Sequence, residues 1–89
     1  MERLLFKIED TFVITGRGLV PVPGAVLEGN ERLRVGDPIE LRRPDGSVLE
    51  WKVGGIESNC SNYRSDEVRI LLTGLTKEEV PIGTEVWTT

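Results

Sequence analysis

The chain has 89 residues, of which 38% are hydrophobic and 29% charged, and its formal net charge is −4. These values indicate one soluble globular domain and exclude a disordered chain. The negative charge argues against strong non-specific binding to nucleic acid, so we expect no DNA partner. No apolar run approaches the ~20 residues that span a bilayer, and we expect no membrane partner. The short apolar run 4–6 lies between charges and does not resemble a leader, which favours a cytoplasmic protein.

Short runs rich in Val, Ile, Leu and Thr alternate with scattered glycine and proline, a pattern typical of all-β domains. In the first part of the chain the expected strands are 4–8, 10–16 and 19–27. Pro21 and Pro23 interrupt the third run, and each would remove a hydrogen bond from a central strand. We therefore expect this segment to form an edge, a bulge or a corner.

A hairpin is the strongest local signal in the second part of the chain. Pro44-Asp45-Gly46 predicts a tight turn in which Asp-Gly supplies positive φ angles. The strand 39–43 precedes it, and the alternating pattern of 48–53 predicts a half-buried antiparallel strand after it. Gly54-Gly55 would let this strand bend and continue as 56–58, and further strands are expected at 68–72 and 85–88.

One segment, 76–80, has a helix-like pattern. Thr76 and Glu79 have the spacing of a capping box, and Pro81 would end the helix after about one turn. Taken together, the runs predict an all-β fold, a small antiparallel closed β-barrel of about seven strands, formed by a single domain over residues 1–89.

The motif Gly16-Arg17-Gly18 follows a strand and has two interpretations. It could be a phosphate-binding loop with Arg17 on the phosphate, or a bend in the barrel that glycine permits. A phosphate cradle needs a helix after the loop, whereas a strand follows here. We therefore favour the structural interpretation, with Arg17 paired to an acid such as Asp10.

Four motifs in order carry a resemblance to a known family. These are FKIEDTFVITGRG, LRVGDPIEL, VGGIES and SDEVRILLTGLTKEEVPIGTEV. They resemble the second domain of translational GTPases, the β-barrel of elongation factor Tu, from about Phe6 to Val86. The resemblance implies that barrel, here as a freestanding chain, and in the family the barrel holds the aminoacylated end of tRNA. The sequence contains no G-x-x-x-x-G-K-[ST] motif, so it forms no nucleotide cradle of that kind.

Two regions depart from the family's pattern. The segment 19–25 is one residue longer and lacks the family's arginine. Residues 56–61 stand in place of the family's I-E-M-F-R/H-K loop. Glu57 matches the family's pattern and Asp66 matches an acidic position, but Glu67 stands where the family has asparagine. A carboxylate there only accepts hydrogen bonds and repels phosphate. These departures favour a protein partner over RNA.

Two groups of residues are candidate binding sites. A basic strip would contain Arg32, Arg34, Arg42, Arg43 and Lys52, and it could contact an acidic partner or a nucleic-acid backbone. A polar loop would offer an aromatic ring, a cation and carboxylates from Glu57, Tyr63, Arg64, Asp66 and Glu67. The alternative for both groups is a solvated surface, which is the commoner role of such charges. Trp51 and Trp87 could stack bases, although core or rim packing is favoured.

The residue types argue against catalysis. The chain has no histidine, and its one cysteine, Cys60, would lack a base to activate it, so we expect no enzyme, metal or cofactor. We expect a non-catalytic binding module with a protein partner, linked to translation. An RNA-binding module contacting tRNA or ribosomal RNA is the alternative, and a small-molecule binder or enzyme accessory subunit is a third. Exposed apolar residues would allow a homodimer; the candidates are Val20, Val22, Leu27 and Ile82.

Overall fold

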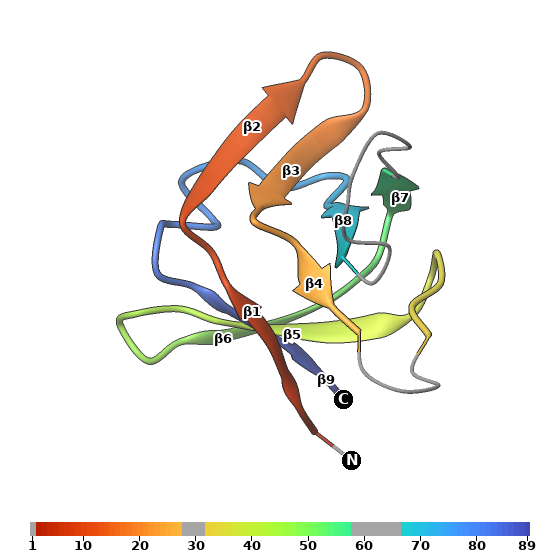
Figure 1. Cartoon of the computed structure of the whole chain (residues 1–89). Coiled ribbons are helices and arrows are strands. Elements are labelled where there is room, and N and C mark those ends of the chain that lie inside the picture. Colours follow the sequence, from red (N-terminus) through yellow and green to blue (C-terminus); the bar gives the residue numbers. More distant parts are fainter. Residues whose placement is uncertain (1, 28–31, 58–66) are drawn as a thin grey trace.

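The protein's structure is a computed structural model that describes residues 2–27, 32–57 and 67–89 (Figure 1). Within these ranges it contains nine strands, all paired antiparallel, and no helix. The strands are β1 (Leu4–Lys7), β2 (Asp10–Ile14), β3 (Gly18–Val22), β4 (Ala25–Val26), β5 (Pro38–Arg42), β6 (Val48–Lys52), β7 (Gly55–Glu57), β8 (Glu67–Leu71) and β9 (Glu85–Thr88). The all-β prediction is confirmed. The expected number of about seven strands was too low, because the run 19–27 divides at Pro23-Gly24 into β3 and β4, and the run 48–58 divides at Val53-Gly54 into β6 and β7.

The strands form three sheets. The largest has four strands in the order β1-β9-β5-β6, the second pairs β2 with β3, and the third has the order β4-β8-β7. A bridge between Leu19 and Leu72 joins the second sheet to the end of β8. No sheet closes on itself within the described ranges, so the closed barrel of the sequence analysis is not established.

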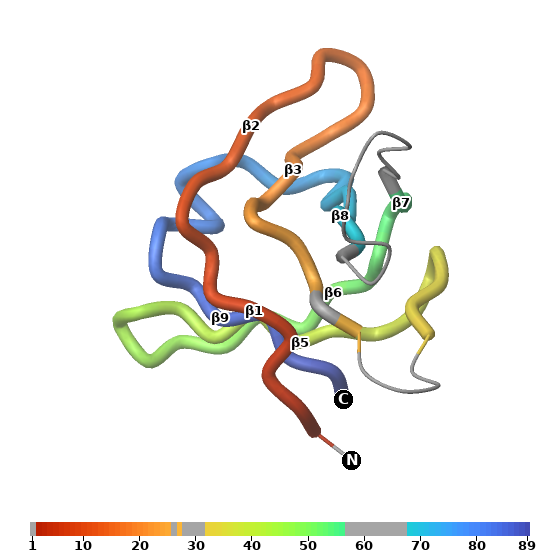
Figure 2. The backbone as a smooth tube through the Cα atoms, viewed as in Figure 1, coloured from red at the N-terminus to blue at the C-terminus, as the bar shows by residue number. Residues whose placement is uncertain are grey.

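The two ends of the described chain lie side by side (Figure 2). Strands β1 and β9 pair, and the amide of Thr88, the last residue of β9, donates to the carbonyl of Arg3, just before β1, at 2.8 Å. The amide of Arg3 in turn donates to the hydroxyl of Thr88 at 2.9 Å. The largest sheet therefore contains both the first and the last strand, although β5 and β6 come from the middle of the chain.

Alternating side chains of the strands form one core. Ile39 and Leu41 of β5, Val86 of β9 and Ile70 of β8 are fully buried in it. In each strand, at least one residue adjacent to these is more exposed, as expected for strands that bury one face. The core therefore connects the inner faces of different sheets, while the outer face of the four-stranded sheet remains at the surface.

The Gly-Arg-Gly motif forms the turn of the β2–β3 hairpin, which projects from the rest of the fold (Figure 1). The amide of Arg17 closes the turn by donating to the carbonyl of Ile14 at 2.9 Å. Gly18 has a φ of +140°, and a Cβ at this position would lie 2.8 Å from the carbonyl oxygen of Leu72. Glycine is needed at Gly18 because a neighbouring backbone lies so close.

Residues 76–80 form turns rather than the expected helix-like segment. The capping-box contacts do occur: the Thr76 amide donates to Glu79 Oε1 at 2.9 Å, and the Glu79 amide lies 3.4 Å from Thr76 Oγ1. Backbone bonds span only three residues, from Glu79 to Thr76 and from Val80 to Lys77. One such turn before Pro81 forms too few hydrogen bonds to offset the free-energy cost of helix nucleation. None of the described residues forms a helix that could cross a membrane.

The expected set of exposed apolar residues was partly wrong. Ile82 is 64% exposed, as predicted, but Val20 is 6% exposed and Leu27 is partly buried against the core. Val22 is half-buried. Instead, Phe12 and Val13 of β2 are exposed, whereas Leu19 and Val20 of the paired strand β3 are buried, so the hairpin packs against the fold mainly through β3.

Candidate functional site

The outer face of the four-stranded sheet gathers charged and aromatic side chains. The cross-strand register places residues from β1, β9, β5 and β6 in two rows. One row contains Lys7, Glu85, Arg42 and Val48, and the other contains Leu4, Trp87, Glu40 and Glu50. Neighbouring side chains in such rows lie within interaction distance. The sheet thus brings together residues from both ends and the middle of the chain.

Arg42 is the last residue of β5 and contacts several side chains of this face. Its Nε donates to Glu40 Oε1 at 2.7 Å, and its Nη2 donates to Glu2 Oε1 at 2.6 Å. Its Cζ lies 4.0 Å from the centroid of the Trp87 ring, a cation–π contact. The hydrogen bonds to Glu40 and then to Glu2 raise the pKa of the Arg42 guanidinium above its usual value. Arg42 is thus held by three side chains.

Trp87 is also held by Glu85 of the same strand. Its indole Nε1 donates to Glu85 Oε1 at 3.0 Å. Glu85 lies directly opposite Arg42 in the register of β5 and β9, and opposite Lys7 in the register of β1 and β9. The ring of Trp87 therefore contacts both the Glu85 carboxylate and the Arg42 guanidinium.

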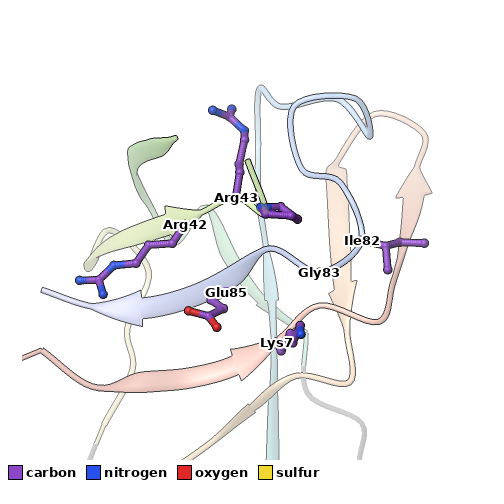
Figure 3. A pocket seen from close by; sticks show the side chains of 7 residues that line it. Lys7, Arg42, Arg43, Ile82, Gly83 and Glu85 are labelled. Atoms are coloured by element: carbon purple, nitrogen blue, oxygen red, sulfur yellow. The ribbon is translucent and has the colours of Figure 1, made fainter. Parts of the chain in front are cut away.

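A cleft of about 390 Å³ lies at one end of this face (Figure 3). It is lined by Lys7, Arg42, Arg43, Pro44, Ile82, Gly83 and Glu85. Figure 3 shows Glu85 between Arg42 and Lys7, while Ile82 projects from the turn before β9. Lys7 has no ion pair with another described residue. The cleft thus combines an exposed apolar side chain with a cation whose charge is not neutralised in this part of the structure.

Arg43 borders the same cleft but points away from Arg42 (Figure 3). Its Nε donates to the backbone carbonyl of Glu79 at 2.7 Å, and its Nη1 lies 3.3 Å from Ser47 Oγ. Both acceptors are neutral. Arg43 therefore connects the β5–β6 turn to the 76–80 turn, and it forms no salt bridge among the described residues.

The turn beside the cleft is held by Asp45. Its Oδ1 accepts the Ser47 hydroxyl at 2.6 Å and the Ser47 amide at 2.9 Å. These two bonds, with the charge of Arg43, lower the pKa of the Asp45 carboxyl below its usual value. Gly46 has a φ of +92°, and its amide donates to the Arg43 carbonyl at 3.0 Å. The predicted Pro-Asp-Gly hairpin is confirmed, except that Gly46 alone supplies a positive φ and Asp45 does not. The turn positions Arg43 and Pro44.

The predicted basic strip does not form a continuous positive surface. Arg42 is bound to two carboxylates, as described above. Arg32 and Arg34 precede the sheet on an exposed segment, and the amide of Arg34 donates to Asp37. Lys52 lies at the far end of β6, opposite Pro38. The structure therefore brings together only Arg42 and Arg43 at the cleft.

The polar loop lies largely outside the described residues. Tyr63, Arg64, Asp66 and Cys60 belong to the undescribed segment. Glu57 ends β7, where its backbone is opposite Arg69, and Glu67 begins β8, where its backbone is opposite Val26. Arg17 is exposed in the hairpin turn of β2 and β3, away from the sheet face described above. A binding role of these residues remains a prediction.

Sequence reasoning missed Lys7, Glu85 and Ile82 as a group. Lys7 and Glu85 are opposite each other in β1 and β9, yet 78 positions apart in the chain. Their alternation with Phe6 and Val86 could have placed each on an outer face. The pairing of the first with the last strand, however, has no local signal. Among the described residues, no three His, Cys, Asp or Glu side chains gather as a metal site would require.

The sequence was compared with known proteins. Elongation factor Tu from the apicoplast of Theileria parva is 39% identical to this chain over 82 residues. The match covers 89% of this chain and 19% of that protein, so the chain spans about a fifth of its length. No family model matches the chain. The chain is therefore similar to a piece of elongation factor Tu, in agreement with the resemblance carried by its motifs.

Proposed function

We propose that this chain is a non-catalytic binding module of the elongation factor Tu domain 2 type, which contacts a protein in the translation apparatus. The likeness to elongation factor Tu supports the connection with translation. The cleft beside Lys7 supports a contact with another macromolecule. Its main feature is Ile82, an apolar side chain 64% exposed at the rim of a cleft of about 390 Å³.

The chemistry of the cleft favours a protein over a nucleic acid. Glu2, Glu40 and Glu85 lie on the same sheet face as Lys7 and Arg42, and they would repel a phosphate backbone. A protein segment can instead place an apolar side chain against Ile82 and a carboxylate near Lys7. Exposed apolar surface rimmed by polar groups is a common feature of protein-binding sites.

We also propose that the three sheets are the wall of one small closed barrel. The bridge between Leu19 and Leu72 and the contacts between β1 and β4 support this arrangement, because they link different sheets. Hydrogen bonds measured across β1 and β4 by NMR scalar couplings would test it. Their absence in a folded sample would leave open sheets as the correct description.

The binding role can be tested by pull-down of the tagged chain from its native lysate, with and without ribonuclease. Ile82→Asp places a charge in the cleft, and Val35→Asp is its matched control, because Val35 is 63% exposed but outside the cleft. We expect the unchanged chain and the Val35→Asp control to retain partner proteins after ribonuclease treatment, and Ile82→Asp to lose them. Equal retention of partner proteins by all three tagged forms of the chain would contradict the role of the cleft.

The alternative, an RNA-binding module, predicts a different outcome. Captured tRNA or ribosomal RNA would be lost on ribonuclease treatment, and its affinity would fall steeply with salt as counterions are released. If the chain retained RNA in this way, and no protein stayed bound to it after ribonuclease treatment, the proposal of a protein partner would be wrong.

A further inference from the structure

Lys7 is a cation at the cleft that has no ion pair within the described part of the chain. Glu85 lies opposite Lys7 in the register of β1 and β9, but it accepts the indole N–H of Trp87 at 3.0 Å. No carboxylate among the described residues forms a salt bridge with Lys7, whereas Arg42 has two such partners. The Arg43 guanidinium extends away from Lys7 (Figure 3). The exposed amine of Lys7 can therefore bind an anion from another molecule.

The apolar part of the cleft lies close to Lys7. The Gly83 amide donates to the Ile8 carbonyl at 2.8 Å, so Gly83 lies across from the residue that follows Lys7. Ile82 directly precedes Gly83, and its side chain is 64% exposed. A Cβ on Gly83 would lie 3.2 Å from Pro44 Cγ, so the proline ring packs over this glycine. The cation and the apolar side chains are thus near enough for one residue of a partner to contact both.

We propose that the cleft binds the C-terminal residue of a partner protein, with its α-carboxylate at Lys7 and an apolar side chain against Ile82 and Pro44. The inference rests on the proposed function and names the part of the partner that the cleft recognises. A chain terminus carries both groups on one residue, and capture of a terminal carboxylate is a recurring mode of peptide recognition. The cleft, about 390 Å³, is within the size range of small ligand sites.

The surroundings of the cleft favour a chain terminus over an internal acidic segment. The carboxylates of Glu2, Glu40 and Glu85 lie on the same sheet face, so a segment with several acidic residues would be repelled. The Pro44 ring over Gly83 also bounds the cleft on one side, where a segment that continued in both directions would have to pass. A terminus brings one negative charge and no chain beyond it.

Titrations followed by NMR test this inference with defined peptides. The first probe is acetyl-Gly-Ser-Gly-Leu with a free C-terminus, and the second is the same peptide with a C-terminal amide. Because exposed ion pairs contribute little, we expect the free peptide to bind with a millimolar dissociation constant. It should shift the amide signals of Lys7, Ile82 and Gly83 to saturation. The amidated peptide should bind at least fivefold more weakly, because it lacks the charge that Lys7 would bind.

A third peptide places the same charge inside the chain. Acetyl-Gly-Leu-Asp-Gly-amide has an apolar residue beside a side-chain carboxylate, and it should also bind at least fivefold more weakly than the free terminus. Equal binding of this peptide would assign the cleft to internal segments and contradict the inference. Equal binding of the amidated first peptide, or no saturable shifts at Lys7 and Ile82 with the free one, would contradict it as well.

Variants of the chain identify the cation. Lys7→Gln should weaken binding of the free peptide at least fivefold and leave the amidated peptide unchanged, because only the free peptide has a carboxylate. Lys52→Gln is the matched control, since Lys52 is an exposed strand residue of the same sheet outside the cleft. The inference is wrong if both variants weaken binding equally. Circular dichroism of each variant excludes loss of fold as the cause.

The pull-down separates this inference from the proposed function. Both require that Ile82→Asp loses the partner proteins, but only the inference requires that Lys7→Gln loses them too. If Lys7→Gln retained the partners that Ile82→Asp loses, the cleft would bind a protein by another part of its chain, and the inference alone would be wrong. Retention by Ile82→Asp would contradict both.

Discussion

The guanidinium of Arg42 lies over the indole ring of Trp87, with 4.0 Å between Cζ and the ring centroid. These two residues come from β5 and β9, and they are diagonal neighbours because Arg42 pairs with Glu85 and Glu40 pairs with Trp87. Since Glu2 and Glu40 also bind the guanidinium, this one cation forms ion pairs with two carboxylates and a cation–π contact with the ring. Arg42 therefore balances an acidic sheet face rather than offering free positive charge to a partner.

Replacing Arg42 with glutamate should lower the thermal stability of the protein. The change would remove the cation–π contact and place a new carboxylate beside Glu2, Glu40 and Glu85. Arg32→Glu makes the same change of charge on an exposed segment before the sheet, and we expect it to have little effect. Thermal unfolding followed by circular dichroism compares the two variants. Equal midpoints would show that the cluster around Arg42 contributes nothing to stability.

The two glycines of the Gly-Arg-Gly turn should differ in their tolerance of alanine. Gly16 has a φ of +80° with no atom within 4 Å of a Cβ, so Gly16→Ala should cost about 1–2 kcal/mol of backbone strain. Gly18 has a φ of +140°, and its Cβ would meet the Leu72 carbonyl at 2.8 Å. Gly18→Ala should therefore cost about 3 kcal/mol or more. Denaturant unfolding measures both. A smaller loss for Gly18→Ala than for Gly16→Ala would contradict the close approach.

Local sequence signals predicted the elements that local chemistry decides. The turn at Asp45 and Gly46 formed as expected, because a side-chain acceptor and a residue with positive φ are both encoded within a few positions. The final strand, 85–88, also had the predicted bounds. The segment 76–80 shows the limit of such signals. Its capping contacts form, yet Pro81 leaves too few residues for a helix.

The candidate site could not be predicted in the same way, since it depends on which strands become neighbours. Lys7, Arg42 and Glu85 meet only because β9 inserts between β1 and β5. Burial was also hard to predict for the β2–β3 hairpin. Phe12 and Val20 are opposite each other in the register, yet Phe12 is 54% exposed and Val20 is 6% exposed. The packing of the hairpin against the rest of the fold, rather than its alternation, decides that difference.

Asp45 should make stability depend on pH in the acid range. Folding lowers the pKa of its carboxyl, so its contribution is complete above the unfolded pKa of about 3.9 and is lost as the pH falls through the folded value. Asp45→Asn should therefore lower stability by a constant amount between about pH 5 and pH 8, with the difference shrinking in acid. Ser47→Ala removes the hydroxyl that contributes most, so NMR titration should find the Asp45 pKa closer to its usual value. An unchanged pKa in Ser47→Ala would contradict this cause.

Thr84 should hold the turn that presents Ile82 at the cleft. It is fully buried, and its Oγ1 donates to the Pro81 carbonyl at 2.6 Å, while its amide donates to the same carbonyl at 3.1 Å. Thr84→Val removes the hydroxyl but leaves that carbonyl one donor, so we expect a loss of about 1 kcal/mol rather than the full cost of an unpaired group. Thr89→Val, at an exposed position, is the control and should be neutral. Denaturant unfolding gives the energies, and the pull-down reports whether a looser turn weakens partner retention. Unchanged stability in Thr84→Val would mean that the amide alone fixes the turn.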